Sequence, residues 1–97
     1  MADLDISIRD RIQIIRFTRP DKKNALKSTM YTAMTDALVA GDASPNVVAH
    51  VFVGSGGIFS AGNDIAEFIE RATGQTSLST QVLGFIRYLP LIRKPVI

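Results

Sequence analysis

The strongest constraint on the fold is a nearly unbroken apolar segment, residues 47–53, which contains four valines and one histidine. Such a segment is typical of a strand buried on both faces of a parallel sheet. Parallel strands need a crossover connection, commonly a helix, and a helix is predicted just upstream, with Ser28 as its N-cap and Gly41 at its end. Its apolar stripe has helical spacing and consists of Met30, Ala33, Met34, Ala37 and Leu38.

Two short segments with alternating apolar residues precede this helix. Residues 9–11 separate them, and their apolar positions are Ile6 and Ile8, then Ile12, Ile14 and Phe17. This spacing predicts a β-hairpin or two adjacent strands. Residues 19–24 follow without periodicity and contain a proline and an asparagine, so we expect a loop there. Strand, helix and strand in this order predict an α/β fold.

The remaining third of the chain contains two further helical patterns. Residues 65–70 have helical spacing, and residues 72–80 are polar and predict a loop. A last helix is predicted near residues 82–89 because Pro90 would stop it. Residues 94–97 have the pattern of the start of another buried strand.

The composition excludes several classes of protein. With 97 residues, 46% hydrophobic and 21% charged, the chain is neither disordered nor collagenous, and it is large enough for one core. It has no cysteine, which excludes disulfides, thiolate metal sites and a thiol nucleophile. Its net charge of +2 is scattered, and no apolar run reaches the ~20 residues of a membrane span. We therefore expect a soluble, cytoplasmic protein without a metal, a nucleic-acid partner or a membrane anchor.

A glycine-rich turn between the strand and the helix at residues 65–70 is the strongest candidate for a site. It contains Gly54, Gly56, Gly57 and Gly62. Unpaired N–H groups at a helix start hold phosphates or developing oxyanions. A Walker A loop would need a lysine followed by serine or threonine, and a dinucleotide fingerprint would need a third glycine in its place, so both are excluded. A functional turn and a purely structural one remain open on these residues alone.

Several charged residues near this turn have ordinary structural explanations. Asp64 and Glu67 would lie in the first turn of a helix, where acids interact favourably with the helix dipole. His50, inside an apolar strand, is expected to be a packed, hydrogen-bonded residue rather than a catalyst. Lys22 and Lys23 are either solvated surface charge or contacts to an anionic ligand.

Two motifs combine into a family resemblance over essentially the whole chain. The segment 19–26, Arg-Pro-Asp-Lys-Lys-Asn-Ala-Leu, and the segment 59–65, Phe-Ser-Ala-Gly-Asn-Asp-Ile, together with residues 94–97, resemble the N-terminal part of the crotonase superfamily, the enoyl-CoA hydratases and isomerases. The resemblance implies that residues 1–97 are the N-terminal part of a crotonase-like core, a spiral of ββα units. It also implies acyl-CoA thioester substrates and assembly into trimers or hexamers, with coenzyme A as part of the substrate rather than a separate cofactor.

The resemblance also implies roles for single residues. The backbone N–H of Asn63 would donate to the thioester oxygen and stabilise the enolate that forms when a proton leaves or adds beside the thioester. Phe68 would line the acyl pocket. The residues implied to bind coenzyme A, with lysines pairing with phosphate, are Lys22, Lys23, Ala25, Ala61, Asn63, Asp64 and Ile65.

The resemblance covers a little over a third of a typical member. In the family, the second oxyanion donor and the catalytic glutamates belong to a region that would follow residues 94–97, so the 97 residues by themselves are expected to be inactive. Glu67 and Glu70 are not at those catalytic positions. One alternative is a non-catalytic module that binds coenzyme A or serves assembly, and another is an unrelated nucleotide-binding α/β domain. Hydration and double-bond migration both remain open.

Overall fold

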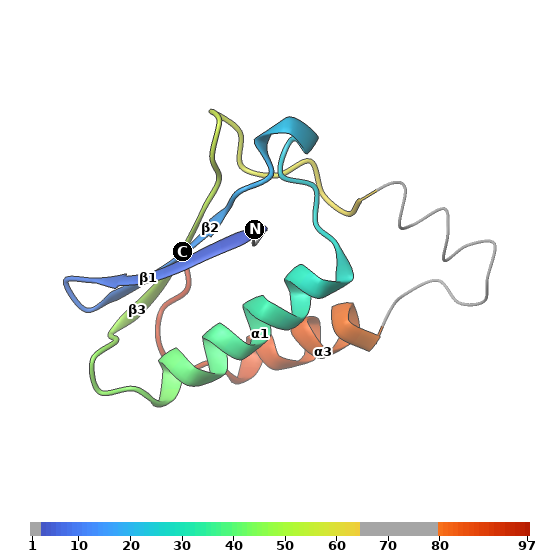
Figure 1. Ribbon diagram of the computed structural model, residues 1–97. Helices are drawn as coiled ribbons and strands as arrows, with labels where there is room; N and C mark the ends of the chain where they lie inside the picture. Colours follow the sequence, from blue (N-terminus) through green and yellow to red (C-terminus); the bar gives the residue numbers. More distant parts are fainter. Residues whose placement is uncertain (1–2, 65–79) are drawn as a thin grey trace.

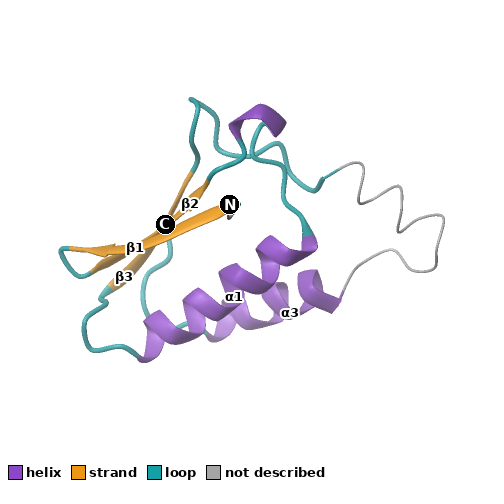
Figure 2. Ribbon diagram, viewed as in Figure 1, coloured by secondary structure: helices purple, strands orange, loops and turns teal. Residues whose placement is uncertain are grey.

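The computed structural model describes residues 3–64 and 80–97 and shows a small sheet with two helices on one side (Figure 1). The sheet has the order β1-β2-β3. The elements are β1 (Leu4–Arg9), β2 (Ile12–Phe17), α1 (Ser28–Ala43), β3 (Ala49–Val53) and α3 (Thr80–Tyr88), with short 3-10 turns at Pro20–Lys22 and Leu89–Leu91. Figure 2 shows how much of the chain between these elements consists of loops. This arrangement confirms the predicted α/β class.

A two-residue turn closes the predicted hairpin. Strands β1 and β2 are antiparallel, with Arg9 opposite Ile12 at the turn. The two turn residues, Asp10 and Arg11, have left-handed φ angles of 52° and 68°. Left-handed conformations at both positions are typical of a type I′ turn, whose twist matches that of the flanking strands.

Strands β2 and β3 are parallel, and α1 connects them, as the sequence predicts. Strand β3 is shorter than the apolar segment 47–53 and begins only at Ala49. Before it, the Val47 N–H donates to the Ser44 carbonyl at 3.3 Å, in a turn rather than in the sheet. The expectation of burial on both faces is also wrong for this part of the chain. Only His50 in β3 is fully buried, because within residues 3–64 and 80–97 both helices lie on one side of the sheet (Figure 1).

The core lies between the sheet and α1. Its buried residues come from both β-strands of the hairpin and from the apolar stripe of the helix: Leu4, Ile15, Phe17, Met30, Met34, Ala37 and Leu38. The second helix, α3, packs against α1, with the ring of Phe85 edge-on to Tyr31 at a centroid distance of 5.4 Å. It ends before Pro90, which confirms the last predicted helix. The predicted helix at 65–70 lies outside the described residues. None of the described helices has the length and apolar character needed to cross a membrane.

Helix α1 differs from its predicted boundaries at both ends. Ser28 is the first helical residue, and the preceding Lys27 is the N-cap in an extended conformation. The reason is that Leu26 pairs with another extended segment, so the backbone stays extended until Lys27. At the other end, the helix continues past Gly41 to Ala43.

Gly41 serves packing rather than helix termination. A Cβ atom at this position would lie 2.5 Å from Gln13 Nε2 and 2.8 Å from His50 Cε1. The missing side chain therefore lets the helix approach two buried polar residues of the sheet. Gln13 Nε2 lies 2.9 Å from the Ala37 carbonyl and 3.0 Å from His50 Nδ1, so these polar atoms are satisfied by one another. This confirms that His50 is a packed, hydrogen-bonded residue.

The end of the chain docks beside β3 through backbone hydrogen bonds. His50 N–H donates to the Pro95 carbonyl at 2.9 Å, and Ile97 N–H donates to the His50 carbonyl at 2.9 Å, which makes a parallel bridge to Val96. The predicted buried strand is thus present only as an isolated bridge, and Val96 and Ile97 are exposed. Lys94 stabilises the junction, because its ammonium group donates to the carbonyls of Gly41 and Ser44 at the C-terminus of α1.

The close approach at Gly41 yields a stability prediction. Alanine favours helices over glycine by about 1 kcal/mol, but in Gly41→Ala its methyl group would overlap buried atoms. We expect Gly41→Ala to lower the free energy of unfolding by about 1–3 kcal/mol, measured by urea denaturation. Gly84, in α3, has no atom within 4 Å of its would-be Cβ. Gly84→Ala should therefore leave stability equal or higher, and equal effects of the two variants would contradict the packing role.

The buried imidazole yields a prediction about pH. Burial lowers the pKa of His50 from its ordinary 6.5, although the Asp42 carboxylate acts in the opposite direction. Because the unfolded chain takes up a proton near this ordinary value and the folded chain does so only at lower pH, stability should fall as the pH drops from about 7 to about 5.5. Burial alone would raise the pKa of Asp42, but hydrogen bonds from the backbone N–H groups of Arg93 and Lys94 outweigh it, and the net effect is a lowered pKa. Asp42 therefore stays ionised in this pH window.

Urea denaturation at several pH values measures this dependence. His50 is the only histidine in the sequence, so His50→Gln should remove the fall in stability between about pH 7 and about pH 5.5. A fall of the same size in His50→Gln would show that another group is responsible.

Candidate functional site

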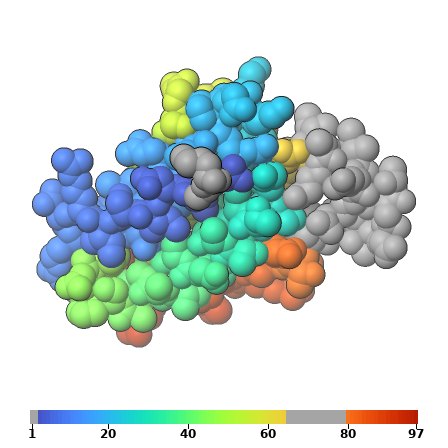
Figure 3. Space-filling view, in the orientation of Figure 1, coloured from blue at the N-terminus to red at the C-terminus, as the bar shows by residue number. Residues whose placement is uncertain are grey.

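The two motifs of the sequence come together at one end of the molecule. The loop that follows β2 and the loop that follows β3 lie in contact at the top of the space-filling view (Figure 3). The contact is close, because a Cβ on Gly56 would lie 2.6 Å from the Cβ of Pro20. Glycine therefore allows both the backbone conformation there, with φ of 71°, and the approach of the two loops.

The side chain of Asn24 joins these loops. It is fully buried, and its amide nitrogen donates to the carbonyls of Ser55 and Ile58, both at 2.9 Å. Its amide oxygen accepts from the backbone N–H of Arg19 at 2.9 Å. The Asn24 carbonyl accepts from the hydroxyl of Ser60 at 2.9 Å. Asn24 belongs to the first motif, but the motif alone predicted no role for it. Its left-handed φ of 55° is a conformation that asparagine tolerates.

A short parallel bridge between the loops orients the backbone of Asn63. Leu26 N–H donates to the Gly62 carbonyl, and Asp64 N–H donates to the Leu26 carbonyl, both at 2.8 Å. In such a bridge the N–H groups alternate in direction, so the N–H of Asn63 points away from Leu26. No atom of the described residues accepts a hydrogen bond from it. Gly62, with φ of 96°, provides the turn into this segment.

A surface pocket of about 460 Å³ lies at this bridge. Its volume is within the range of small-molecule sites. The lining residues are Arg19, Lys22, Lys23, Ala25, Ala61, Asn63 and Asp64. Six of the seven residues implied to bind coenzyme A therefore surround one pocket. Ile65 and the acyl-pocket candidate Phe68 lie outside the described residues.

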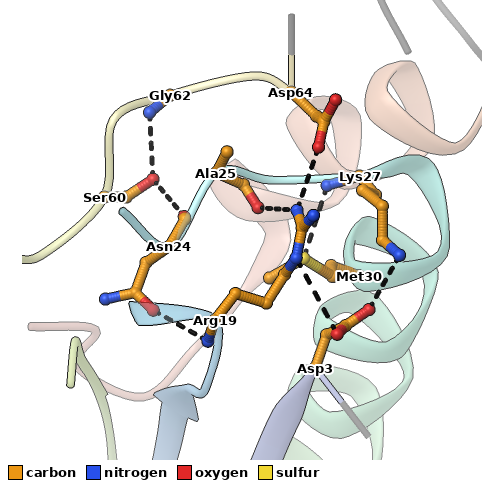
Figure 4. A network of polar contacts seen from close by, with 9 residues as sticks. All are labelled: Asp3, Arg19, Asn24, Ala25, Lys27, Met30, Ser60, Gly62 and Asp64. Atoms are coloured by element: carbon orange, nitrogen blue, oxygen red, sulfur yellow. Dashed lines mark hydrogen bonds and ion pairs between the residues drawn. The ribbon is translucent and has the colours of Figure 1, made fainter. Parts of the chain in front are cut away.

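Arg19 is the pocket residue that the sequence analysis missed as a site residue. Its Nη1 atom donates to the Ala25 carbonyl at 2.6 Å and to the Asp64 carboxylate at 3.1 Å (Figure 4). The structure pairs the Asp64 carboxylate with this guanidinium. The signal for this pairing was the Arg-Pro start of the first motif. The expected interaction of Asp64 with the dipole of a helix at residues 65–70 stays a prediction, because that segment lies outside the described residues. Glu67, with the same expected role as Asp64, lies outside the described residues.

A side-chain contact also holds Asn63 from the helix side. The hydroxyl of Tyr31, in α1, lies 2.6 Å from Asn63 Oδ1. Tyr31 in turn packs against Phe85 of α3. The amide oxygen of Asn63 is thus paired with the protein, whereas its backbone N–H has no acceptor among the described residues.

The chemistry of the pocket suits an anionic or polarised oxygen ligand. Two lysines and an unpaired N–H donor line it, while the carboxylate of Asp64 is neutralised by Arg19. Within the part of the chain that the structure describes, no three His, Cys, Asp or Glu side chains gather as a metal site would require.

Comparison with known proteins connects this pocket to a family. The chain matches the family model described as Enoyl-CoA hydratase/isomerase over residues 7–97. The chain belongs to the enoyl-CoA hydratase/isomerase family. Its fold is accordingly the N-terminal part of the crotonase fold, which confirms the resemblance found in the sequence.

Three relatives illustrate the range of this enoyl-CoA hydratase/isomerase family. Enoyl-CoA delta isomerase 3, peroxisomal, of Mus musculus is 39% identical over 70 residues, 72% of this chain and 22% of the mouse protein. The 4-chlorobenzoyl coenzyme A dehalogenase-2 of an Arthrobacter species is 38% identical over 68 residues, 68% of this chain and 25% of that protein. The solved enoyl-CoA hydratase of Mycobacterium marinum has a TM-score of 0.81 and 29% identity, covering 98% of this chain and 46% of that one. The chain thus spans less than half of each relative.

The central position of Asn24 yields a prediction for this site. Asn24→Ala would remove the donor to the Ser55 and Ile58 carbonyls and the acceptor of the Arg19 N–H, and it would place alanine at a left-handed φ. We expect the free energy of unfolding to fall by about 2–4 kcal/mol in urea denaturation. Asn46 is exposed, and among residues 3–64 and 80–97 only its backbone N–H forms a hydrogen bond, to Ser44 Oγ. Asn46→Ala should cost less than about 0.5 kcal/mol, and a similarly small cost at Asn24 would refute its role as the joint between the loops.

Proposed function

We propose that this protein, in its complete form, acts on acyl-CoA thioesters and that the backbone N–H of Asn63 donates to the thioester carbonyl oxygen. One observation carries the proposal: within the described residues this N–H has no acceptor, and Asn63 lines a pocket with two lysines. Removal or addition of a proton beside a thioester places negative charge on that oxygen. A fixed N–H donor there is worth about 3–4 kcal/mol in the transition state.

The other lining residues support binding of the coenzyme A part of the substrate. Lys22 and Lys23 line the pocket, and their ammonium groups would pair with the phosphate groups of coenzyme A. Ala25 and Ala61 are small residues that line the same pocket and leave room for a ligand beside the two lysines. By the family resemblance, Asp64 and Ile65 contribute backbone contacts and Phe68 lines the acyl pocket.

The names of the relatives support a shared substrate class rather than one reaction. They describe an isomerase, a dehalogenase and a hydratase, and each name contains a coenzyme A derivative. We infer for this protein enolate chemistry on such a thioester, with an oxyanion hole to which Asn63 contributes one donor. The resemblance further leads us to propose a homotrimer or hexamer that uses coenzyme A only as part of its substrate. Light scattering after gel filtration tests the oligomeric state. The cytoplasmic location expected from the composition stays a proposal.

A second candidate function is binding of coenzyme A without turnover. One observation favours it: of the described residues that line the pocket, Asp64 is the sole carboxylate, and Arg19 holds it in an ion pair at 3.1 Å. The described pocket residues thus include no free carboxylate for proton transfer. Saturable binding of coenzyme A with no turnover of any enoyl-CoA would favour this function over the enzyme.

Replacement of Asn63 by proline tests the proposed donor. Proline removes the N–H, which makes no hydrogen bond within the described residues, so the fold should survive. We expect Asn63→Pro to lower kcat for hydration or isomerisation of an enoyl-CoA by about a hundredfold or more. Binding of free coenzyme A, measured by calorimetry, should change much less, because free coenzyme A has no thioester oxygen.

Two further variants make the result specific to the backbone. Asn63→Ala keeps the N–H and loses only the contact to the Tyr31 hydroxyl, so it should retain most of the turnover. Asp64→Pro removes an N–H that bonds to the Leu26 carbonyl, so it should lower the melting temperature. A folded Asn63→Pro protein with unchanged kcat would refute the role of this donor.

A further inference from the structure

One side chain, Arg19, contacts both loop segments that form the short bridge at the pocket. Its guanidinium donates to the carbonyl of Ala25, the residue before Leu26, and to the carboxylate of Asp64, the residue after Asn63. Leu26 and Asn63 are the bridge partners. Arg19 therefore ties together the neighbours of both bridge residues, and Figure 4 shows its side chain between these segments.

Arg19 is itself fixed before any ligand arrives. Its backbone N–H donates to the side chain of the fully buried Asn24, and its side chain is only 11% exposed. The Asp3 carboxylate lies 3.8 Å from its Nε atom, which is beyond hydrogen-bond distance, so this contact adds little to how Arg19 is fixed. A side chain held from several directions loses little further freedom when it orients its neighbours.

The charge of Arg19 also bears on the donor at Asn63. The Asp64 carboxylate follows this donor directly in the chain and is only 14% exposed. A free carboxylate beside the pocket would oppose negative charge developing on a bound oxygen, since like charges repel most strongly where water is scarce. The ion pair with Arg19 removes this opposition.

We propose that Arg19 is a positioning residue, which holds the Leu26–Asn63 bridge and neutralises Asp64 so that the Asn63 N–H faces the reacting oxygen. This inference rests on the proposed function and adds to it a residue that acts on the donor rather than on the substrate. Both contacts to the pocket segment come from the single atom Nη1 of a planar group. A lysine ammonium keeps the charge but not this planar geometry.

Three variants of the complete protein test the proposal. Arg19→Met removes the charge and both hydrogen bonds, and Arg19→Lys keeps the charge alone. Asp3→Asn is the matched control, because it removes the other carboxylate that Arg19 contacts and leaves the bridge untouched. For each we would measure kcat, KM, the melting temperature, the affinity for free coenzyme A, and the infrared frequency of the thioester carbonyl of a bound acyl-CoA.

We expect Arg19→Met to lower kcat at least about tenfold while the affinity for free coenzyme A changes less than about threefold. The downshift of the carbonyl frequency that a hydrogen bond from Asn63 causes should shrink in parallel. The kcat and the carbonyl frequency of Arg19→Lys should lie between those of wild type and Arg19→Met. If Arg19→Met does not fold, Arg19→Lys still tests the proposal. Asp3→Asn should keep kcat within about twofold of wild type.

Two results would overturn the proposal. One is a folded Arg19 variant with wild-type kcat and carbonyl frequency. The other is a fall in kcat that is explained entirely by a lower melting temperature, while the carbonyl frequency in the folded protein equals that of wild type. If Asn63→Pro is inactive while Arg19→Met is fully active, this inference alone fails. If the wild-type protein neither binds nor turns over an acyl-CoA, the proposed function fails and this inference with it.

Discussion

The buried side chain of Asn24 is the interaction on which the pocket end of the molecule depends. It bonds to two carbonyls of one loop and to one N–H of the other, and no other side chain in the described chain joins these loops so fully. Buried amides are costly unless all their partners are present. The two loops therefore adopt their conformations together, and the placement of Gly62 and Asn63 is a consequence of a contact more than thirty residues apart in sequence.

The opposite end of the molecule relies on a different arrangement of polar groups. There Gly41 lets α1 approach Gln13 and His50, and Lys94 and Asp42 attach the last residues of the chain to the helix. The Asp42 carboxylate accepts from the backbone N–H groups of Arg93 and Lys94, so contacts to the end of a helix set where the bridge between Val96 and His50 forms. Both ends of the small core are thus closed by hydrogen bonds between distant segments.

Elements with strong periodicity could be predicted from the sequence, and contacts between distant segments could not. The helix stripe from Met30 to Leu38 and the alternation around Ile14 led to the correct elements, because period and burial follow directly from local geometry. Gly41 was misassigned as a helix end, since only the folded chain brings His50 against it. The ion pair between Arg19 and Asp64 was not predicted for the same reason: the two residues are 45 positions apart in the sequence.

The motifs led to the correct family and brought Lys22, Lys23, Ala25, Ala61, Asn63 and Asp64 into one set, and the structure places all six around one pocket. Their spacing says nothing about which groups are already paired with each other. The direction of the Asn63 N–H follows from a bridge to Leu26, and a bridge is a property of two segments. Residue types near a site were thus predictable, whereas the orientation of a backbone group was not.

A donor that belongs to the main chain also affects how such a site changes in evolution. Every amino acid except proline carries the same N–H at position 63, so the side chain there is free to drift with little effect on that hydrogen bond. The residues that set the path of the backbone there are instead Asn24, Gly62 and Arg19. A search for a reactive side chain at position 63 would therefore miss the backbone N–H of Asn63. The residues that indicate it are Gly62, which precedes it, and Asn24, which lies in the other loop.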